Sequence, residues 1–412
     1  MKYEEYKNSG IEWIGEMPSH WRVMPIKRTG SFENGLTYSP TDVCDENGVL
    51  VLRSSNIQND KLSFEDNVYV AKCPLSLMVK SGDIIICSRN GSASLVGKCA
   101  MVEGNINATY GAFMMRYRPI CKSNKVFSYY LLQTALKCYK GLYSTTTINQ
   151  LTKGVIGQIY VSYPPFHEQQ AIATYLDEKC GEINRAIDVQ KKKIDLLNEL
   201  KQTIITDAVT KGLDPNIPMK DSGVQWIGKI PKHWKIKRTR FLCKIQTGDK
   251  DTVNRIDDGQ YPFYVRSPKV ERIDSYSFDG EAVLMAGDGV GAGKVFHYAN
   301  GKFDYHQRVY NLHNFKDVSG MYYFYYISNK FKYIIEEGAA KNTVDSVRLN
   351  MIQDFWVTIP PLSEQQIIVA HIEKETTKID SQITKANRRI ELLEELKQSI
   401  ITEAVTGKIK VC

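Results

Sequence analysis

The sequence lacks the patterns that mark secreted, membrane-spanning and zinc-dependent proteins. Its nine cysteines are scattered, and the closest two, Cys87 and Cys99, stand twelve positions apart. No pair has the spacing of a zinc knuckle or a redox site, and an odd number of separate thiols suits a reducing cytoplasm. No apolar run approaches the length needed to cross a membrane. The polar N-terminal segment MKYEEYKNSG does not predict a signal peptide.

The motifs that would predict an enzyme are also missing. The segment AGDGVGAGK (286–294) resembles a phosphate-binding loop, but Asp288 stands where the first glycine is required and valine follows the lysine. The YPPF at 163–166 resembles the catalytic loop of an adenine-N6 methyltransferase, yet Tyr163 replaces the required amide or carboxylate. The seven histidines include no His-Glu-x-x-His motif. The sequence therefore predicts no catalytic residue and no metal ligand.

The composition is that of a folded chain with more than one domain. A length of 412 residues suits two or three domains. A hydrophobic content of 42% with 10% aromatic residues is enough for hydrophobic cores. The net charge of +8 permits a polyanionic partner such as DNA, but many proteins without one have a similar charge.

One long helical pattern occurs twice, at 164–210 and 360–406, with a constant offset of 196 positions. Twelve of the last fifteen residues are identical between the copies. Apolar residues follow a seven-residue repeat with charged flanks, which is typical of a coiled-coil seam. The seam positions are Leu176, Ile183, Ile187, Ile194, Leu197, Ile204 and Ala208, and in the second copy Ile372, Ile379, Ile383, Ile390, Leu393, Ile400 and Ala404.

The ends of both helices are marked by residue type. A Pro-Pro pair cannot lie inside a helix, so it fixes each start. In the second copy Ser363 and Gln366 predict a capping box. Gly212 and Gly407 stand where a left-handed cap residue is expected. Helices of about forty residues are rods of roughly 60 Å. A single such helix could serve a generic dimerisation coil, but two copies in one chain can pair with each other, antiparallel and related by a pseudo-twofold axis.

A second repeat precedes each globular block. SGIEWIGEMPSHW (9–21) returns as SGVQWIGKIPKHW (222–234), with an offset of 213 that still holds at the Arg-Ser pairs of 53–54 and 266–267. Because the offset later becomes 196, the first half carries seventeen extra residues, which we place between Ser54 and Gly97. The polar, Gly- and Pro-containing segment 210–223 is predicted to be the linker between two tandem halves.

The fold class predicted is α+β, with two globular α/β blocks separated by a pair of long antiparallel coiled-coil helices. Each block contains short β-rich runs, at 49–53, 83–87 and 112–118 in the first and at 261–266 and 281–286 in the second. A helix is predicted in each, at 126–139 and 321–337. The domains are 1–162 (first block with its lead-in), 163–212 (first helix), 213–358 (linker and second block) and 359–412 (second helix).

Basic and amide side chains in the predicted turns favour a binding function. Arginine and lysine can donate to guanine or phosphate, and asparagine and glutamine can pair with adenine. Any single charged loop residue is more often simply solvated. The candidate DNA-binding residues are Arg53, Arg89, Asn90 and Lys98 in the first block and Arg266, Lys294, Gln307, Arg308, Lys341 and Arg348 in the second.

The order of these motifs resembles a known family over essentially the whole chain. W-I-G-x-x-P-x-x-W, a variable block and P-P-x-x-E-Q-x-x-I opening a long helix occur in that order, twice. This arrangement resembles the specificity subunit of type I restriction–modification systems. The resemblance implies that the blocks are target recognition domains, each reading half of a split site in double-stranded DNA. It also implies that the helices separate the half-sites and dock two modification subunits.

The resemblance further implies the cofactors and the remaining partners. The specificity subunit binds no cofactor, whereas its modification subunits use S-adenosylmethionine and its restriction subunits use ATP and magnesium. Two alternatives remain open on the residues alone. One is a stand-alone DNA methyltransferase or nuclease, and the other is a bivalent scaffold that recruits two proteins and no DNA. Salt-dependent binding to duplex DNA separates the scaffold from the DNA-binding subunit.

Overall fold

A computed structural model describes residues 2–139, 150–339 and 346–411 of the chain. The chain forms two compact units. Unit 1 comprises Met1–Val189 and Arg389–Cys412, and unit 2 comprises Gln190–Arg388. This division passes through both long helices, whereas the sequence-based scheme gave each helix a segment of its own. In the described part of the chain, no helix is long and apolar enough to cross a membrane.

The described part of unit 1 is built on fourteen short strands: β1 (Tyr6–Asn8), β2 (Glu16–Pro18), β3 (Arg22–Pro25), β4 (Gly30–Asn34), β5 (Val43–Cys44), β6 (Val49–Leu52), β7 (Ile57–Gln58), β8 (Lys61–Leu62), β9 (Tyr69–Val70), β10 (Ile84–Cys87), β11 (Cys99–Met101), β12 (Ala108–Tyr110), β13 (Met114–Pro119) and β14 (Tyr160–Tyr163). Two four-stranded sheets have the orders β11-β10-β13-β4 and β12-β6-β9-β5. The predicted strands at 49–53, 83–87 and 112–118 are confirmed as β6, β10 and β13.

Unit 2 contains ten strands in its described part: β15 (Met219–Asp221), β16 (Lys229–Pro231), β17 (Lys235–Arg238), β18 (Lys244–Thr247), β19 (Tyr261–Tyr264), β20 (Glu271–Ile273), β21 (Phe278–Ala286), β22 (Phe296–Tyr305), β23 (Val309–His313) and β24 (Trp356–Ile359). Six of them form one sheet in the order β18-β23-β21-β22-β19-β20. The longest strands, β21 and β22, make an antiparallel pair at its centre.

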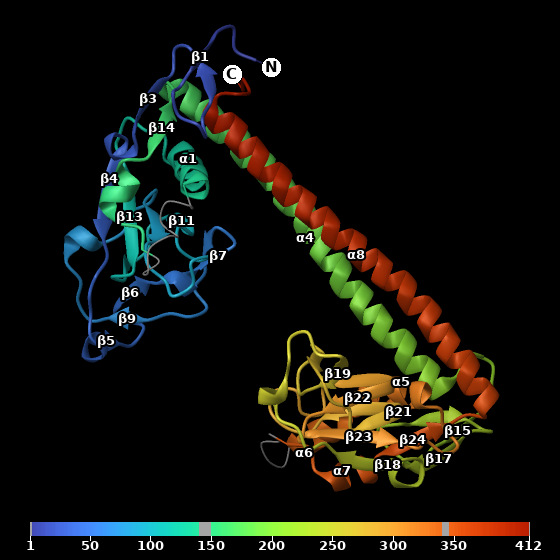
Figure 1. The fold of residues 1–412 in the computed structure, drawn as a ribbon. Coiled ribbons are helices and arrows are strands. Elements are labelled where there is room, and N and C mark those ends of the chain that lie inside the picture. Colours follow the sequence, from blue (N-terminus) through green and yellow to red (C-terminus); the bar gives the residue numbers. More distant parts are fainter. Residues whose placement is uncertain (1, 140–149, 340–345, 412) are drawn as a thin grey trace. The chain divides into compact units, whose positions relative to one another are not determined.

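Each unit also contains short helices. Unit 1 has α1 (Lys125–Cys138) and α3 (Lys153–Gly157), and unit 2 has α5 (Gly320–Lys330), α6 (Lys332–Ala339) and α7 (Leu349–Gln353). In unit 2, α5 packs on β21 and β22 (Figure 1). The helix predicted over 126–139 is confirmed, but the single helix predicted over 321–337 is wrong. It divides into α5 and α6 at Phe331, whose fully buried ring packs against Phe355.

The two long helices are α4 (Phe166–Lys211) and α8 (Leu362–Thr406). Each starts directly after its Pro-Pro pair, as predicted. Gly212 and Gly407 follow with φ angles of 75° and 77°, so both left-handed caps are confirmed. The predicted capping box is wrong, because Ser363 lies inside the first turn of α8. Instead, the Gln365 side chain donates to the carbonyl of Pro360 across 2.9 Å, and Gln169 does the same to Pro164.

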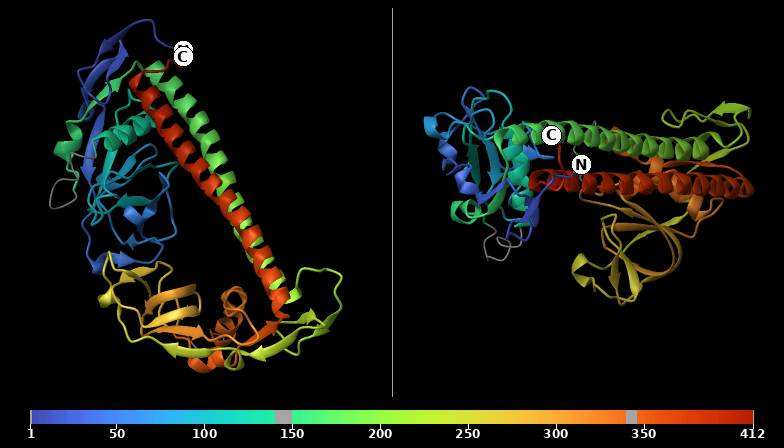
Figure 2. Two further views of the ribbon diagram at one scale, coloured as in Figure 1. Left: turned by 45° about the vertical axis from the view of Figure 1, so that its right-hand side comes forward. Right: turned by 90° about the horizontal axis from the view of Figure 1, so that it is seen from above.

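Within each unit, the start of one long helix lies beside the end of the other (Figure 2). In unit 1 the hydrophobic core includes Ile172 and Leu176 of α4 together with Ile401, Ala404 and Val405 of α8. In unit 2 the core takes its helical residues from the other ends, Ile205, Ala208 and Val209 of α4 and Ile368 and Ile372 of α8. Each seam position predicted from the heptads is buried or half-buried.

A hydrogen bond that occurs in both units joins the last strand of the block to the end of a helix. In unit 1 the Ser162 hydroxyl donates to the carbonyl of Val405 across 2.5 Å, and in unit 2 the Thr358 hydroxyl donates to the carbonyl of Val209 across 2.8 Å. These carbonyls belong to the last helical turn, where backbone acceptors have no partner within the helix. The contact therefore satisfies a helix end while it positions the block.

A carboxylate in the first turn of each long helix holds the repeated lead-in. Glu168 accepts hydrogen bonds from the indole of Trp21 (2.9 Å) and the hydroxyl of Tyr3 (2.9 Å), and it lies 2.6 Å from Nε2 of His20. In unit 2, Glu364 accepts from Trp234 (3.0 Å) and contacts His233. Burial by itself would raise the pKa of Glu168, but its hydrogen-bond donors together lower that pKa. The repeated Trp, His and Glu residues therefore form one anchoring cluster.

Replacing Glu168 with glutamine should loosen the lead-in of unit 1. A hydrogen bond to a charged acceptor contributes about 1.5–3 kcal/mol, and the neutral amide has one acceptor oxygen instead of two. We expect the amide protons of residues 6–21 to exchange about tenfold faster or more, as measured by hydrogen–deuterium exchange. The control is Glu178→Gln, an exposed position on the same helix. Unchanged exchange in the lead-in would contradict the anchoring role.

The same cluster predicts a pH dependence. Because the folded pKa of Glu168 lies below its ordinary value of 4.5, its stabilising contribution is present above pH 4.5 and is lost as the pH falls through the folded pKa. The lead-in of the unaltered chain should therefore exchange faster in that acidic range. In the Glu168→Gln variant this acid-induced increase should be smaller.

Candidate nucleic-acid interface

In both units the same backbone contacts hold the loops at one end of the strands, and we call this arrangement the scaffold. In unit 1 the amide of Ser88, directly after β10, donates to the carbonyl of Phe113 across 3.0 Å. In unit 2 the amide of Gly287, directly after β21, donates to the carbonyl of Arg308 across 2.8 Å. Phe113 and Arg308 each stand in the tight turn that precedes β13 or β23. The two residues therefore occupy equivalent positions, although no sequence pattern aligns them.

A second contact extends this scaffold. Arg89 forms an isolated antiparallel bridge with Gln150, and Asp288 forms the corresponding bridge with Ser346. In both units the residue that forms the bridge directly follows the residue that makes the first contact, Ser88 or Gly287. Arg89 and Asp288 are therefore equivalent as well, and the two units present opposite charges at this point.

Strand register corrects one part of the sequence alignment. Leu52 of β6 lies opposite Tyr110 of β12, and Tyr264 of β19 lies opposite Tyr305 of β22. The offset between the units is here 212 and not 213. The two Arg-Ser pairs that the sequence aligned are therefore out of register by one residue.

Three of the four candidates in unit 1 contact the loop backbone or neighbouring side chains. Asn90 donates to the hydroxyl of Ser54 across 3.3 Å, and the Lys98 ammonium donates to the carbonyl of the same serine across 3.3 Å. Arg53 forms an ion pair of 2.8 Å with Asp66. These side chains shape the loop edge, and they remain candidates for contacts to DNA.

The fourth candidate, Arg89, is exposed and packs on an exposed aromatic ring. Its guanidinium lies 5.4 Å from the ring centroid of Phe113. Both residues border a hollow of about 1220 Å³ in unit 1, together with Arg53 and Asn90. The structure therefore brings three of the predicted residues to one concave surface, and it adds Phe113 to them.

In unit 2 the carboxylate of Asp288 lies close to two of the predicted arginines. Asp288 lies 2.9 Å from Nη1 of Arg266 and 3.6 Å from Nε of Arg308. The arginine side chains are 43% and 66% exposed, whereas the aspartate is 25% exposed. Asp288 thus restrains both guanidinium groups while much of each remains accessible to a ligand.

A buried histidine supports the same turn. Nδ1 of His306 accepts the backbone N–H of Arg308 across 2.9 Å. Burial lowers the pKa of His306, and the nearby Arg266 lowers it further. The ring is therefore neutral near pH 7, with its proton on Nε2, which lies 3.8 Å from a carboxylate oxygen of Asp251. That carboxylate also accepts from the Gln307 side chain across 2.9 Å.

The remaining candidates of unit 2 are two exposed loop residues and one residue that the structure does not describe. Lys294 is exposed in the loop between β21 and β22, and Arg348 is exposed directly before α7, two residues after the bridge at Ser346. Lys341 lies outside the described residues.

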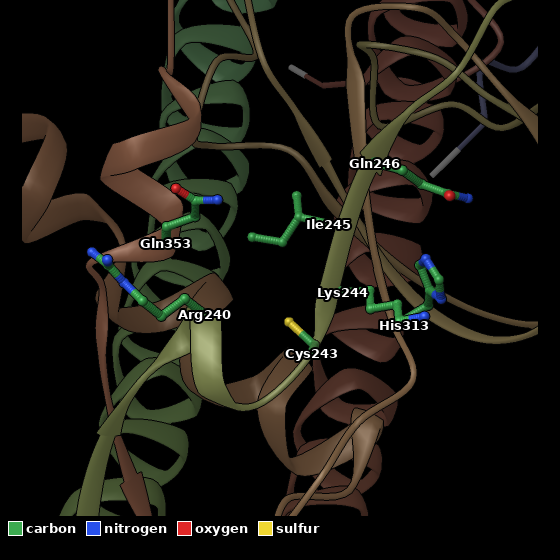
Figure 3. A pocket seen from close by; sticks show the side chains of 7 residues that line it. All are labelled: Arg240, Cys243, Lys244, Ile245, Gln246, His313 and Gln353. Carbon is green, nitrogen blue, oxygen red and sulfur yellow. The ribbon is translucent and has the colours of Figure 1, made fainter.

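Another hollow in unit 2, of about 440 Å³, runs along the edge strand β18. Figure 3 shows Cys243 and Ile245 on one side of this strand and Lys244, Gln246 and His313 on the other. Its polar side chains thus do not converge on one point. The loop surface that carries Arg266, Gln307 and Arg308 is therefore the better candidate interface.

The two edges offer a ligand different chemistry on one scaffold. Unit 2 presents guanidinium and amide donors, the groups that pair with guanine and adenine edges or with phosphate. Unit 1 presents a guanidinium beside an apolar ring. Sequence reasoning missed Phe113, because it lies in a run predicted as strand. It missed Asp288 because the search for nucleic-acid contacts considered only basic and amide side chains.

Comparisons with known proteins agree with the resemblance found in the sequence. A family model described as the type I restriction–modification DNA specificity domain matches residues 18–199 and 231–394. The chain is 23% identical to the type I restriction enzyme StySPI specificity subunit of Salmonella potsdam, over 96% of this chain and 90% of that protein. It is 30% identical to the EcoDI specificity subunit of Escherichia coli, over 44% of this chain and 40% of that protein.

A solved structure shows the same fold over nearly the full length. The comparison chain comes from a study of complex assembly and conformational transition of the type I restriction–modification system. The match covers 95% of this chain and 99% of the other, with a TM-score of 0.69 and 16% sequence identity.

The neutral state of His306 can be tested directly. We expect its imidazole to titrate below the ordinary value of 6.5 in the folded protein, because burial disfavours the charged ring. Since the folded pKa is the lower one, this contribution to stability is complete above pH 6.5 and is lost as the pH falls through the folded pKa. The NMR shifts of the ring protons report the titration, and loss of that signal in His306→Gln assigns it. A pKa at or above 6.5 would contradict this account.

Proposed function

Since the chain belongs to the type I restriction–modification DNA specificity family, we propose that each of its two blocks reads one half of a split, asymmetric DNA site. The chain is the DNA-recognition subunit of such a system and contributes recognition, not catalysis. The blocks span about 22–162 and about 235–358. One observation supports the asymmetry above all: equivalent scaffold positions carry Arg89 and Phe113 in one unit and Asp288 and Arg308 in the other. Different side chains on one scaffold favour different base sequences.

In this proposal the candidate residues contact DNA from the loop edges. The set is Arg53, Arg89, Asn90 and Lys98 in unit 1 and Arg266, Lys294, Gln307, Arg308, Lys341 and Arg348 in unit 2. Arginines at the ends of loops suit paired hydrogen bonds to guanine, and the others suit phosphate or adenine. The described members of this set lie in loops and turns between strands and helices, which agrees with a role for the sheets as supports.

The long helices form an antiparallel coiled coil with an internal pseudo-twofold axis, and they set the distance between the half-sites. Support comes from the contacts that occur in both units. The hydrogen bonds Ser162–Val405 and Thr358–Val209 are equivalent, and each joins a block to the helix from the opposite half of the chain. In each unit the two helices contribute opposite ends to one core.

Two modification subunits dock on the helices, and restriction subunits join that complex. The support is a pair of exposed leucines that occurs twice at an offset of 196: Leu196 and Leu200 in unit 2, and Leu392 and Leu396 in unit 1, each 48–56% exposed. Leucines four positions apart share one helix face, and exposed apolar patches often mark interfaces. The partner subunits supply S-adenosylmethionine, ATP and magnesium chemistry, and the complex works in the cytoplasm.

Selection of bound duplexes from a random pool tests the proposed function. With the assembled complex, we expect an interrupted site with two different half-sequences. A perfect palindrome or one uninterrupted motif would contradict the assignment. Contacts to phosphate make DNA binding weaken steeply as the salt concentration rises. If no such salt-dependent binding to duplex DNA is measured, the non-DNA scaffold is favoured instead.

Replacing Arg308 with glutamine should relax one position of the half-site read by unit 2. A good paired contact to a base discriminates by about 1–3 kcal/mol, so a tenfold or larger loss of preference is expected there. The control is Lys316→Gln, which removes the same charge at an exposed position of the same unit. Repeated selection measures both variants, and an altered half-site for unit 1 would speak against the assignment.

Replacing Leu392 and Leu396 together with serine should weaken one of two docking sites. Burial of a half-exposed leucine contributes roughly 1 kcal/mol, half the value for complete burial. Native mass spectrometry should then detect complexes with one modification subunit, held by the intact pair in unit 2. Glu394→Ser, an exposed position on the same helix, is the control. Retention of two subunits with unchanged affinity would place the docking surface elsewhere.

Lengthening both helices tests their role as a spacer. Insertion of seven residues after Leu197 and after Leu393 preserves the heptad pattern and adds about 10 Å. Base pairs stack at about 3.4 Å, so the preferred gap should grow by about three base pairs while both half-sequences stay the same. Insertions of four residues, which shift the heptad, serve as the comparison. If the lengthened protein binds with an unchanged gap, the helices do not measure the site.

A further inference from the structure

Phe113 is an exposed residue in a turn of unit 1 whose backbone is held by hydrogen bonds. Its side chain is 61% exposed. Its carbonyl accepts three hydrogen bonds, from the backbone amides of Ser88 (3.0 Å) and Arg89 (3.1 Å) and from the Ser88 hydroxyl (2.9 Å). A backbone turn fixed in this way loses little conformational freedom on binding a ligand. The turn therefore presents an apolar group with a defined position.

The surroundings of the ring favour nucleic acid as the ligand. Arg89 lies over the ring, and Arg53 and Asn90 border the same hollow. The equivalent position in unit 2 is Arg308, a candidate for base contact. An aromatic residue at a position that carries an arginine in the sister unit, and that has cationic neighbours, suits a polyanionic partner better than an apolar protein surface.

The contact with Arg89 also restricts how the ring can meet DNA. A wedge residue inserts between two stacked bases, so both faces of its ring must be free. Here a guanidinium 5.4 Å from the centroid covers one face of the Phe113 ring. The edge of the ring remains free to approach a base from the groove. Contact between an apolar side chain and the C5-methyl group of thymine is a known form of readout in the major groove.

We propose that Phe113 is a specificity-determining residue that reads the C5-methyl group of one thymine in the half-site of unit 1. This inference rests on the proposed function and deepens it. Arg89 is the positioning residue that restrains the ring, and its exposed guanidinium can donate to an adjacent base or phosphate. At the equivalent position of unit 2 stands Arg308, which provides hydrogen-bond donors and no apolar ring.

The test replaces one thymine at a time with uracil, which removes only the methyl group. Selection with the assembled complex first identifies the two half-sites. We expect one thymine in the half-site of unit 1 at which uracil weakens binding about fourfold, the equivalent of about 0.8 kcal/mol for one buried carbon group. In the Phe113→Ala complex the same exchange should have no effect, and preference for thymine at that position should be lost. Phe113→Leu, which keeps an apolar side chain, should retain part of the effect.

Controls separate the inference from general damage and from the proposed function. Phe64→Ala removes another exposed aromatic ring of unit 1, 49% exposed, and should leave the uracil effect unchanged. If neither complex binds a split site, the proposed function itself fails. If a split site is bound but no thymine of the unit 1 half-site responds to uracil, the inference is overturned.

Two further results would also overturn it. Loss of DNA bending in Phe113→Ala, without any uracil effect in the unaltered complex, would identify the ring as a wedge. Weaker assembly with the partner subunits, at unchanged DNA discrimination, would identify Phe113 as a protein contact.

Discussion

A carboxylate in the first turn of each long helix is the interaction on which the arrangement of each unit depends. Glu168 and Glu364 accept from an indole and lie beside a histidine of the repeated lead-in. The first turn of a helix has free N–H groups and the positive end of the helix dipole, so a carboxylate is favourable there. The glutamate thereby joins two segments that are distant in sequence, the lead-in and the helix.

With the helix start fixed, the end of the block is fixed by the other helix. Ser162 and Thr358 donate to carbonyls in the last turn of α8 and α4 respectively. Every unit thus needs helical segments from both halves of the chain, and neither half completes its core alone. This requirement explains why the helix sequences are so similar in the two halves, while the recognition loops, which take no part in these two hydrogen bonds, differ.

Those loops differ in chemistry more than in backbone. The turn at Phe113 and the turn at Arg308 are held by the same hydrogen bond to the segment after the central strand. Backbone hydrogen bonds can form with almost any side chain. The scaffold can therefore carry phenylalanine or arginine at one position (Phe113, Arg308) and arginine or aspartate at the other (Arg89, Asp288). One support can therefore carry two recognition surfaces.

Local patterns in the sequence were enough to predict the two long helices, their start at the Pro-Pro pairs, their glycine caps and five of the strands, because periodicity and special backbone residues are local signals. The sequence also identified the family through motifs repeated in order. Three features depend on long-range packing and are absent from local signals: the one-residue shift at β6 and β19, the division of α5 from α6 at Phe331, and the role of the repeated glutamates. Tertiary structure alone placed Phe113 beside Arg89 and Asp288 between two arginines, because side chains from separate loops meet only after the sheets have formed.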